Sequence, residues 1–163
     1  MKKRFNAYDK SLYEFITNIL VKCPKCSKKA IVKSNGINED ENEVKFVCSN
    51  CGMTKYYSET LTEKFITSRN GKILEMRHLI IGENVDPFFK FSLWLQKDLS
   101  SGLLWAYNYE HLAFLENHVS AELRERNINE MRNKSIGSRL PKWMTSKKNR
   151  TEVLNGIQKL KNQ

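Results

Sequence analysis

The chain of 163 residues has few of the residues that interrupt regular structure, with only seven glycines and three prolines. This composition excludes disordered and fibrous proteins and indicates a globular one. No apolar run approaches the roughly 18 to 20 residues of a membrane-spanning helix, and residues 1–20 alternate charged and apolar side chains. We therefore expect neither export nor a membrane partner.

Cysteine is also scarce, but the four cysteines form two pairs, Cys23 with Cys26 and Cys48 with Cys51. Two residues between paired cysteines let a tight turn bring both sulfurs to one metal ion, so the spacing predicts one zinc ion, Zn²⁺, on four thiolates. With every ligand position filled by cysteine, this zinc is expected to be structural. Iron in a rubredoxin-like site and a pair of disulfides are the alternatives. Thiols that stay free to bind metal indicate a reducing compartment, and we expect a cytoplasmic protein.

At these residues the chain resembles the zinc-ribbon proteins, which include the ribbon of transcription factor IIB and RNA polymerase subunits. The likeness covers about residues 21–60 and implies a metal and a fold, but zinc ribbons bind DNA, RNA or proteins. Residues 86–95, 104–115 and 139–150 look like stretches of uncharacterised bacterial ribbon proteins and imply no activity. Gly52, after the last cysteine, permits a left-handed turn, whereas Ser27 occupies the equivalent place in the first turn. The second turn is therefore expected to suit a metal better.

The periodicity of the apolar residues predicts an α+β fold that begins with an N-terminal amphipathic helix over residues 8–20, capped by Asp9. The ribbon follows as three short antiparallel strands, and Asn70-Gly71 marks a hairpin. The remaining expected elements are a hairpin joining 91–95 to 103–107, a long helix from Asn108 to Arg126, an irregular basic stretch over 127–149 and a C-terminal helix over 150–160. The expected ribbon strands are 30–33, 44–47 and 53–57. We divide the chain into residues 1–60, 61–126 and 127–163.

The positive charge is concentrated near the C-terminus. The whole chain has a net charge of +10, and residues 124–163 contain eleven basic and three acidic residues, a net charge of +8. Such a segment attracts polyanions and gains affinity for nucleic acid by releasing counterions. The alternative is a solvated surface that keeps the protein soluble.

The leading hypothesis is a nucleic-acid-binding protein, with DNA or RNA as its partner and possible roles in transcription, replication or defence. Aromatic rings beside lysines can stack on unpaired bases while the lysines contact phosphates, although those rings would equally fill a thin core. The candidate contacts are Lys28, Lys29, Lys45, Lys55, Tyr56, Arg139, Lys142, Trp143, Lys147, Lys148 and Arg150.

The alternative is an adaptor that docks a partner protein through its ribbon or through an apolar patch, which Phe88, Phe89, Phe91 and Trp94 would form if they are exposed. We expect no enzymatic activity, since the sequence has no phosphate-binding glycine loop, nucleophile elbow or carboxylate cluster. His111 and His118 are expected to be surface or partly buried side chains. His78, within an apolar run, is expected in the core.

Overall fold

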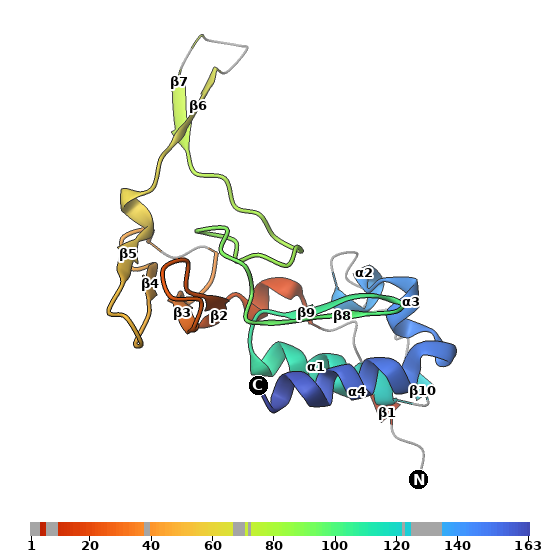
Figure 1. Cartoon of the computed structure of the whole chain (residues 1–163). Coiled ribbons are helices and arrows are strands. Elements are labelled where there is room, and N and C mark those ends of the chain that lie inside the picture. Colours follow the sequence, from red (N-terminus) through yellow and green to blue (C-terminus); the bar gives the residue numbers. More distant parts are fainter. Residues whose placement is uncertain are drawn as a thin grey trace.

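A computed structural model gives the architecture of the chain (Figure 1). It contains helices and small, mostly antiparallel sheets, as expected for an α+β fold. The residues that the structure describes are 4–5, 10–37, 40–66, 71, 73–121, 123–124 and 135–163.

The ribbon is a sheet of four antiparallel strands in the order β2-β3-β4-β5, one strand more than expected. The three predicted strands are present. Each begins one residue away from its predicted start, and the last also ends one residue early. The strands are β2 (Ile19–Lys22), β3 (Lys29–Lys33), β4 (Lys45–Val47) and β5 (Thr54–Tyr56). Alternation along β3 buries Ala30 and Val32 and exposes the lysines at both ends of the strand.

The expected N-terminal helix is not formed over the described part of residues 8–20, so that prediction was wrong; the additional strand, β2, begins at its last two residues. The described part of residues 8–20 holds only a 3-10 helix, η1 (Leu12–Phe15), which Ser11 and Glu14 close with a capping box. Asn18 then takes a left-handed conformation, with φ 48°. β2 is drawn into extended pairing because the Leu20 amide donates to the Tyr107 carbonyl at 2.8 Å, while the Leu20 carbonyl accepts from Trp94. Asp9 lies outside the described residues.

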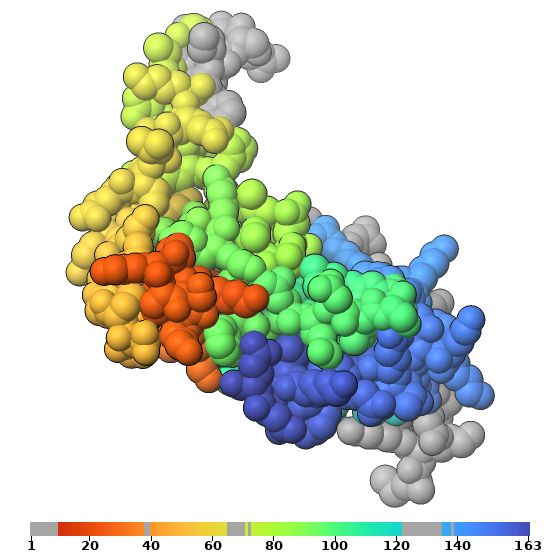
Figure 2. Space-filling model, viewed as in Figure 1, coloured from red at the N-terminus to blue at the C-terminus, as the bar shows by residue number. Residues whose placement is uncertain are grey.

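Two hairpins follow the ribbon. The first, β6 (Glu63–Ile66) with β7 (Ile73–Met76), confirms a hairpin around Asn70-Gly71, although Asn70 itself is outside the described residues. Because Ile66 pairs with Ile73, the register differs from that of the two-residue turn which this dipeptide favours. This pair of strands projects from the body as an arm (Figures 1 and 2). The second hairpin joins β8 (Leu95–Leu99) to β9 (Gly102–Ala106).

The start of β8 corrects the expected strand at 91–95, because the preceding residues belong to a loop ordered by Asp86. The buried Asp86 carboxylate accepts hydrogen bonds from the amides of Phe88, Phe89 and Phe91 at 2.6–3.0 Å. Burial raises the pKa of Asp86 to about 6, against the opposing effect of these three amides. The loop is therefore fixed by one side chain rather than by strand pairing.

The long helix, α1 (Tyr109–Ser120), begins where predicted, and the Asn108 side chain accepts from the His111 amide as its N-cap. It ends earlier than expected: Ala121 is extended, and β10 (Leu123–Arg124) pairs in parallel with β1 (Arg4–Phe5). The described part of residues 127–149 is more helical than expected. It forms α2 (Ile136–Arg139), α3 (Lys142–Thr145) and the 3-10 helix η4 (Lys147–Asn149).

The C-terminal helix, α4 (Arg150–Lys161), confirms the prediction and packs beside α1 beneath the β8–β9 hairpin (Figure 1). Its Glu152 carboxylate accepts hydrogen bonds from Ser100 and Ser101 in the turn between β8 and β9. Gly156 lets the helix approach Leu99 and Leu104 closely. Helix and hairpin therefore depend on each other.

One buried apolar cluster runs from Phe15 in η1 to Leu160 in α4 and includes ribbon residues such as Phe46. His111 and His118 are both buried, which corrects the expectation of surface histidines. Burial lowers the pKa of His111 to about 3, so this ring is neutral, and its Nδ1 accepts from the Tyr107 amide at 3.2 Å. None of the described helices is long and apolar enough to cross a membrane.

Candidate metal centre and basic surfaces

The two cysteine pairs lie on turns with the same hydrogen-bond pattern. In the first, the Cys23 amide donates to Lys28 O at 2.9 Å and the Ser27 amide donates to Cys23 O at 2.8 Å. In the second, the Cys48 amide donates to Met53 O and the Gly52 amide to Cys48 O, both at 2.9 Å. Each turn ends the strand before it and starts the strand after it, so the sheet fixes their relative position.

Both turns need one residue in the left-handed region of backbone space. Gly52 has φ 71° and Ser27 has φ 58°, so the serine adopts the conformation that glycine adopts in the other turn. The first turn is therefore as well formed as the second, contrary to the expectation that Ser27 would fit poorly. A left-handed L-residue costs roughly 1–2 kcal/mol, which locates a local strain at Ser27.

The four sulfurs are close enough to hold one metal ion. All four lie within 4.8 Å of one another, and the Cys23–Cys51 and Cys26–Cys48 sulfur pairs are each 3.6 Å apart. Four thiolates at about 2.3 Å from a tetrahedral zinc would be about 3.8 Å from each other, so the cluster fits that geometry. Disulfides are excluded, since a disulfide bond is about 2.05 Å long and all four cysteines are free.

The protein supplies groups that favour thiolates at this centre. The Lys28 amide hydrogen-bonds the Cys26 sulfur and lowers the pKa of that thiol to about 6. The Met53 amide lowers the pKa of Cys51 in the same way, but burial and the three neighbouring sulfurs together raise it to about 11. One thiolate therefore forms readily, and its negative charge disfavours ionisation of the neighbouring thiols. A divalent cation would remove this repulsion by neutralising the charge of the thiolates.

The solvent-facing side of the ribbon sheet is basic. Antiparallel partners share a face of the sheet, and Lys22 pairs with Lys29 while Lys33 pairs with Lys45. Lys45 is also opposite Tyr56, which is 43% exposed. No acidic residue occurs in β2–β5. We call these four lysines and Tyr56 the outer ribbon face.

Two further predicted ribbon contacts lie elsewhere. Lys28 is exposed in the first cysteine turn, beside the sulfurs. Lys55 is opposite Phe46 across β4 and β5 and therefore lies on the other face of the sheet from Tyr56. Three of the five predicted ribbon contacts, Lys29, Lys45 and Tyr56, thus share one face.

The predicted C-terminal contacts lie at the opposite end of the molecule from the ribbon (Figure 1). Two of them have structural contacts: the Trp143 ring covers Gly102, and the Arg150 guanidinium donates to Ala121 O at 3.2 Å. The remaining four side chains, Arg139, Lys142, Lys147 and Lys148, are exposed.

The expected apolar docking patch is largely core. Phe88 is buried, and Phe89, Phe91 and Trp94 are half-buried against the same cluster. Phe89 and Phe91 are stacked with ring centres 5.5 Å apart, and Phe46 meets both edge-on. The strongly exposed apolar side chains lie instead at the arm, at Leu61, Ile73 and Met76.

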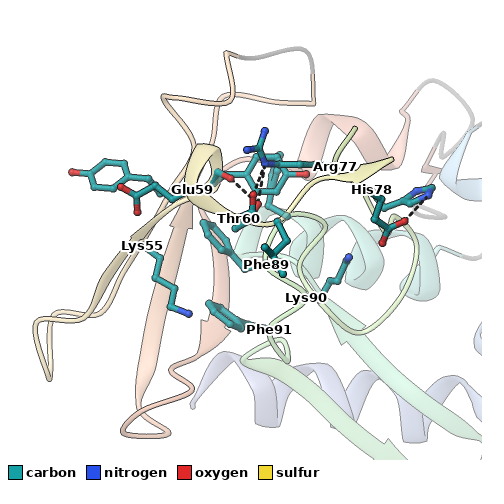
Figure 3. A pocket seen from close by; sticks show the side chains of 13 residues that line it. Lys55, Glu59, Thr60, Arg77, His78, Phe89, Lys90 and Phe91 are labelled. Carbon is teal, nitrogen blue, oxygen red and sulfur yellow. Dashed lines mark hydrogen bonds and ion pairs between the residues drawn. The ribbon is translucent and has the colours of Figure 1, made fainter. Parts of the chain in front are cut away.

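A groove of about 460 Å³ lies between β5, the base of the arm and the Asp86 loop (Figure 3). Lys55 and Lys90 flank the stacked phenylalanines, while Arg77 and His78 lie farther along. His78 is exposed and lies 3.5 Å from Glu63, so the expectation of a core histidine was wrong. Lys90, Arg77 and His78 could not be recognised from the sequence as groove residues, because no periodicity links them to β5.

Arg77 anchors the arm to the ribbon end. Its guanidinium bonds to Glu41 and to the carbonyl and hydroxyl of Thr60, and it lies over the Tyr57 ring at 5.6 Å. Its hydrogen-bonding capacity is thus largely used within the protein. Lys55 and Lys90, by contrast, form no ion pair with any described residue.

No protein-family model, curated protein or solved structure matches the chain. Function is therefore inferred from the geometry of the cysteine cluster and of the charged surfaces.

Proposed function

We propose that the chain is a nucleic-acid-binding zinc-ribbon protein of the cytoplasm whose single zinc ion is structural. Four thiolates complete a tetrahedral shell and leave no position for a catalytic water, so the proposal includes no enzymatic role. Zinc is favoured over iron as a closed four-thiolate staple that is inert to redox chemistry. The metal would hold the two turns together and so fix the register of the sheet that carries the lysines.

The observation that carries the nucleic-acid proposal is the direct pairing of lysines on the outer ribbon face. Like charges directly opposite each other on a sheet are destabilising. Lys22–Lys29 and Lys33–Lys45 are two such pairs, and none of the four lysines is in an ion pair with a described residue. A bound polyanion would remove the repulsion within each pair by neutralising the lysines. The exposed ring of Tyr56 beside the second pair suits a nucleic-acid base.

The exposed C-terminal residues Lys147 and Lys148 have the second role in this proposal. They belong to η4, which follows α3, and α3 lies at the opposite end of the molecule from the ribbon (Figure 1), so they would contact a different stretch of the same polyanion or attract it at long range. DNA and RNA are both compatible with this arrangement.

The test is binding of the zinc-loaded protein to short labelled DNA and RNA oligonucleotides across a salt series. We expect submicromolar affinity at physiological salt, with a log–log slope of about −4 or steeper for some five phosphate contacts. K33Q/K45Q should weaken binding by about tenfold and reduce the magnitude of the slope by roughly 1.4 to 1.8. K147Q/K148Q removes the same charge from the other end and should have the smaller effect. Equal effects of the two double variants would contradict the ribbon assignment.

A protein adaptor is the second candidate, because the arm exposes large apolar side chains. Leu61 is 95% exposed, Ile73 59% and Met76 55%. An isolated two-stranded hairpin is only marginally stable in water, so a partner protein that covers this arm would stabilise it. Ile73→Asp should then abolish capture of that partner and leave nucleic-acid affinity and zinc content unchanged. Phe88 is unsuitable for such a test, since that side chain is buried.

A further inference from the structure

The groove of Figure 3 and the outer ribbon face meet at one strand. β5 is the edge strand of the ribbon sheet, and its alternation places Lys55 and Tyr56 on opposite faces. Tyr56 pairs with Lys45 on the outer face, while Lys55 lies over the ring of Phe91, with 5.9 Å from Nζ to the ring centre. A strand of nucleic acid that follows the outer face therefore reaches the groove by crossing one edge.

The groove carries charges of both signs, and its unpaired cations flank the phenylalanines. Lys55 and Lys90 lie on either side of these rings (Figure 3), and neither is in an ion pair with a described residue. Two carboxylates also line the groove: Glu63 is paired with His78, and Glu59 is the second. A strand of nucleic acid with one base against the phenylalanines would place the phosphates on either side of that base near the two lysines.

The wall between the lysines is aromatic and firmly supported. Phe89 and Phe91 are stacked at an interplanar angle of 13°, both are half-buried, and both line the groove. The Asp86 carboxylate holds the amides of both residues, so the rings are fixed before a ligand arrives. Rings held in this way stack on nucleobases with little loss of conformational entropy.

We infer that this groove receives an unpaired nucleobase against the phenylalanines, with the phosphates on either side of that base near Lys55 and Lys90, and so makes the protein selective for single-stranded nucleic acid. The inference rests on the proposed function and specifies the form of nucleic acid. A duplex keeps its bases stacked inside and presents only phosphates and groove edges, so it can use the outer ribbon face but not the aromatic wall. The volume of about 460 Å³ is within the range of pockets that bind small molecules, roughly 300–1,000 Å³.

The test compares three double variants that remove the same charge, K55Q/K90Q, K33Q/K45Q and K147Q/K148Q, on labelled single-stranded oligonucleotides and on the matching duplex. A fourth variant, Phe89→Leu, removes the aromatic face and keeps an apolar side chain. We expect K55Q/K90Q to weaken single-strand binding about tenfold and Phe89→Leu to weaken it at least fivefold, with duplex binding changed less than twofold by either. Zinc content and the thermal unfolding curve of each variant establish that the fold is retained.

The outcomes separate this inference from the proposal beneath it. If K33Q/K45Q weakens binding of both probes while K55Q/K90Q and Phe89→Leu change neither, the protein binds nucleic acid but the groove assignment is wrong. Equal affinity of the unaltered protein for single strand and duplex overturns the inference in the same way. If the unaltered protein binds no probe at physiological salt, the proposed function and the groove assignment are both overturned.

Discussion

Removal of the metal should unfold the ribbon and spare the rest of the protein. Structural zinc sites contribute about 10–16 kcal/mol, compared with a total stability of about 5–15 kcal/mol for a typical domain. The described strands β3, β4 and β5 have three to five residues each, and their sheet is closed at one end by the two cysteine turns. Without an ion, four sulfurs within 4.8 Å repel as thiolates or lose their ligand role as thiols.

Away from the cysteine turns, the buried cluster continues between the two long helices and the β8–β9 hairpin. Helices α1 and α4 have twelve residues each, pack on each other and cover the β8–β9 hairpin. Leu112, Leu115, Val153 and Ile157 are fully buried or nearly so at this junction. We therefore expect chelation to leave most of the helical signal intact, since α1 and α4 contain most of the described helix.

Hydrogen exchange measured by mass spectrometry on zinc-loaded and EDTA-treated protein checks this prediction. Amides of β3–β5 should lose their protection, those of α1 and α4 should keep it, and β2 should lie between, because Leu20 also bonds to Tyr107 and Trp94. Cys48→Ser should give the same pattern without a chelator. Uniform loss of protection along the chain, or none in β3–β5, would refute the reasoning.

Three substitutions test the local packing through urea unfolding of the zinc-loaded protein. Gly102→Ala should lower the free energy of unfolding by about 1–3 kcal/mol more than Gly36→Ala does. A Cβ at Gly102 would lie 2.6 Å from the Trp143 ring, whereas Gly36 has a positive φ but open space around it. Equal losses for the two variants would contradict this. Ser27→Gly should stabilise the protein by roughly 0.5–1 kcal/mol by relieving the left-handed serine, and a loss would show that its hydroxyl matters. Asp86→Asn should cost about 1–3 kcal/mol, because the amide NH₂ would face a backbone N–H, and an unchanged midpoint would exclude that conflict.

The metal centre was predictable because its information is local. Two residues between paired cysteines determine a turn, and a turn determines where both sulfurs point. The same holds for the cap of α1, where Asn108 bonds to the amide three residues later, and for the apolar stripe of α4. In each case the residues that define the element also supply most of its contacts.

The prediction of an N-terminal helix was wrong for the opposite reason, because the deciding contacts are not local. Leu12, Phe15, Ile16 and Ile19 have helical spacing, but consecutive buried residues from Ile19 onward also suit a strand covered on both sides. The choice between them depends on Tyr107, some ninety residues away, whose carbonyl accepts from the β2 backbone. No local pattern contains that information.

The groove was hidden from the sequence for a related reason. Lys55 belongs to the ribbon, Lys90 to the Asp86 loop and Arg77 to the base of the arm, and only the fold brings them to one site. A signal was nevertheless present in Asp86, since an aspartate followed by Pro87 and Phe88 marks a side-chain-capped turn. What could not be foreseen is that this turn faces β5.

The distribution of charge along the sequence indicated the C-terminal segment as the main polyanion-binding surface. The fold makes the ribbon the stronger candidate. Part of that segment is used for packing, since Trp143 covers Gly102 and Arg150 bonds to Ala121 O. The ribbon strands have fewer basic residues, but there Lys33 and Lys45 are held opposite each other with no acidic residue in the sheet. A lysine pair fixed by strand register creates a local potential that scattered side chains on short helices do not. For this reason the loss of affinity should be larger for K33Q/K45Q than for K147Q/K148Q, although both variants remove two charges.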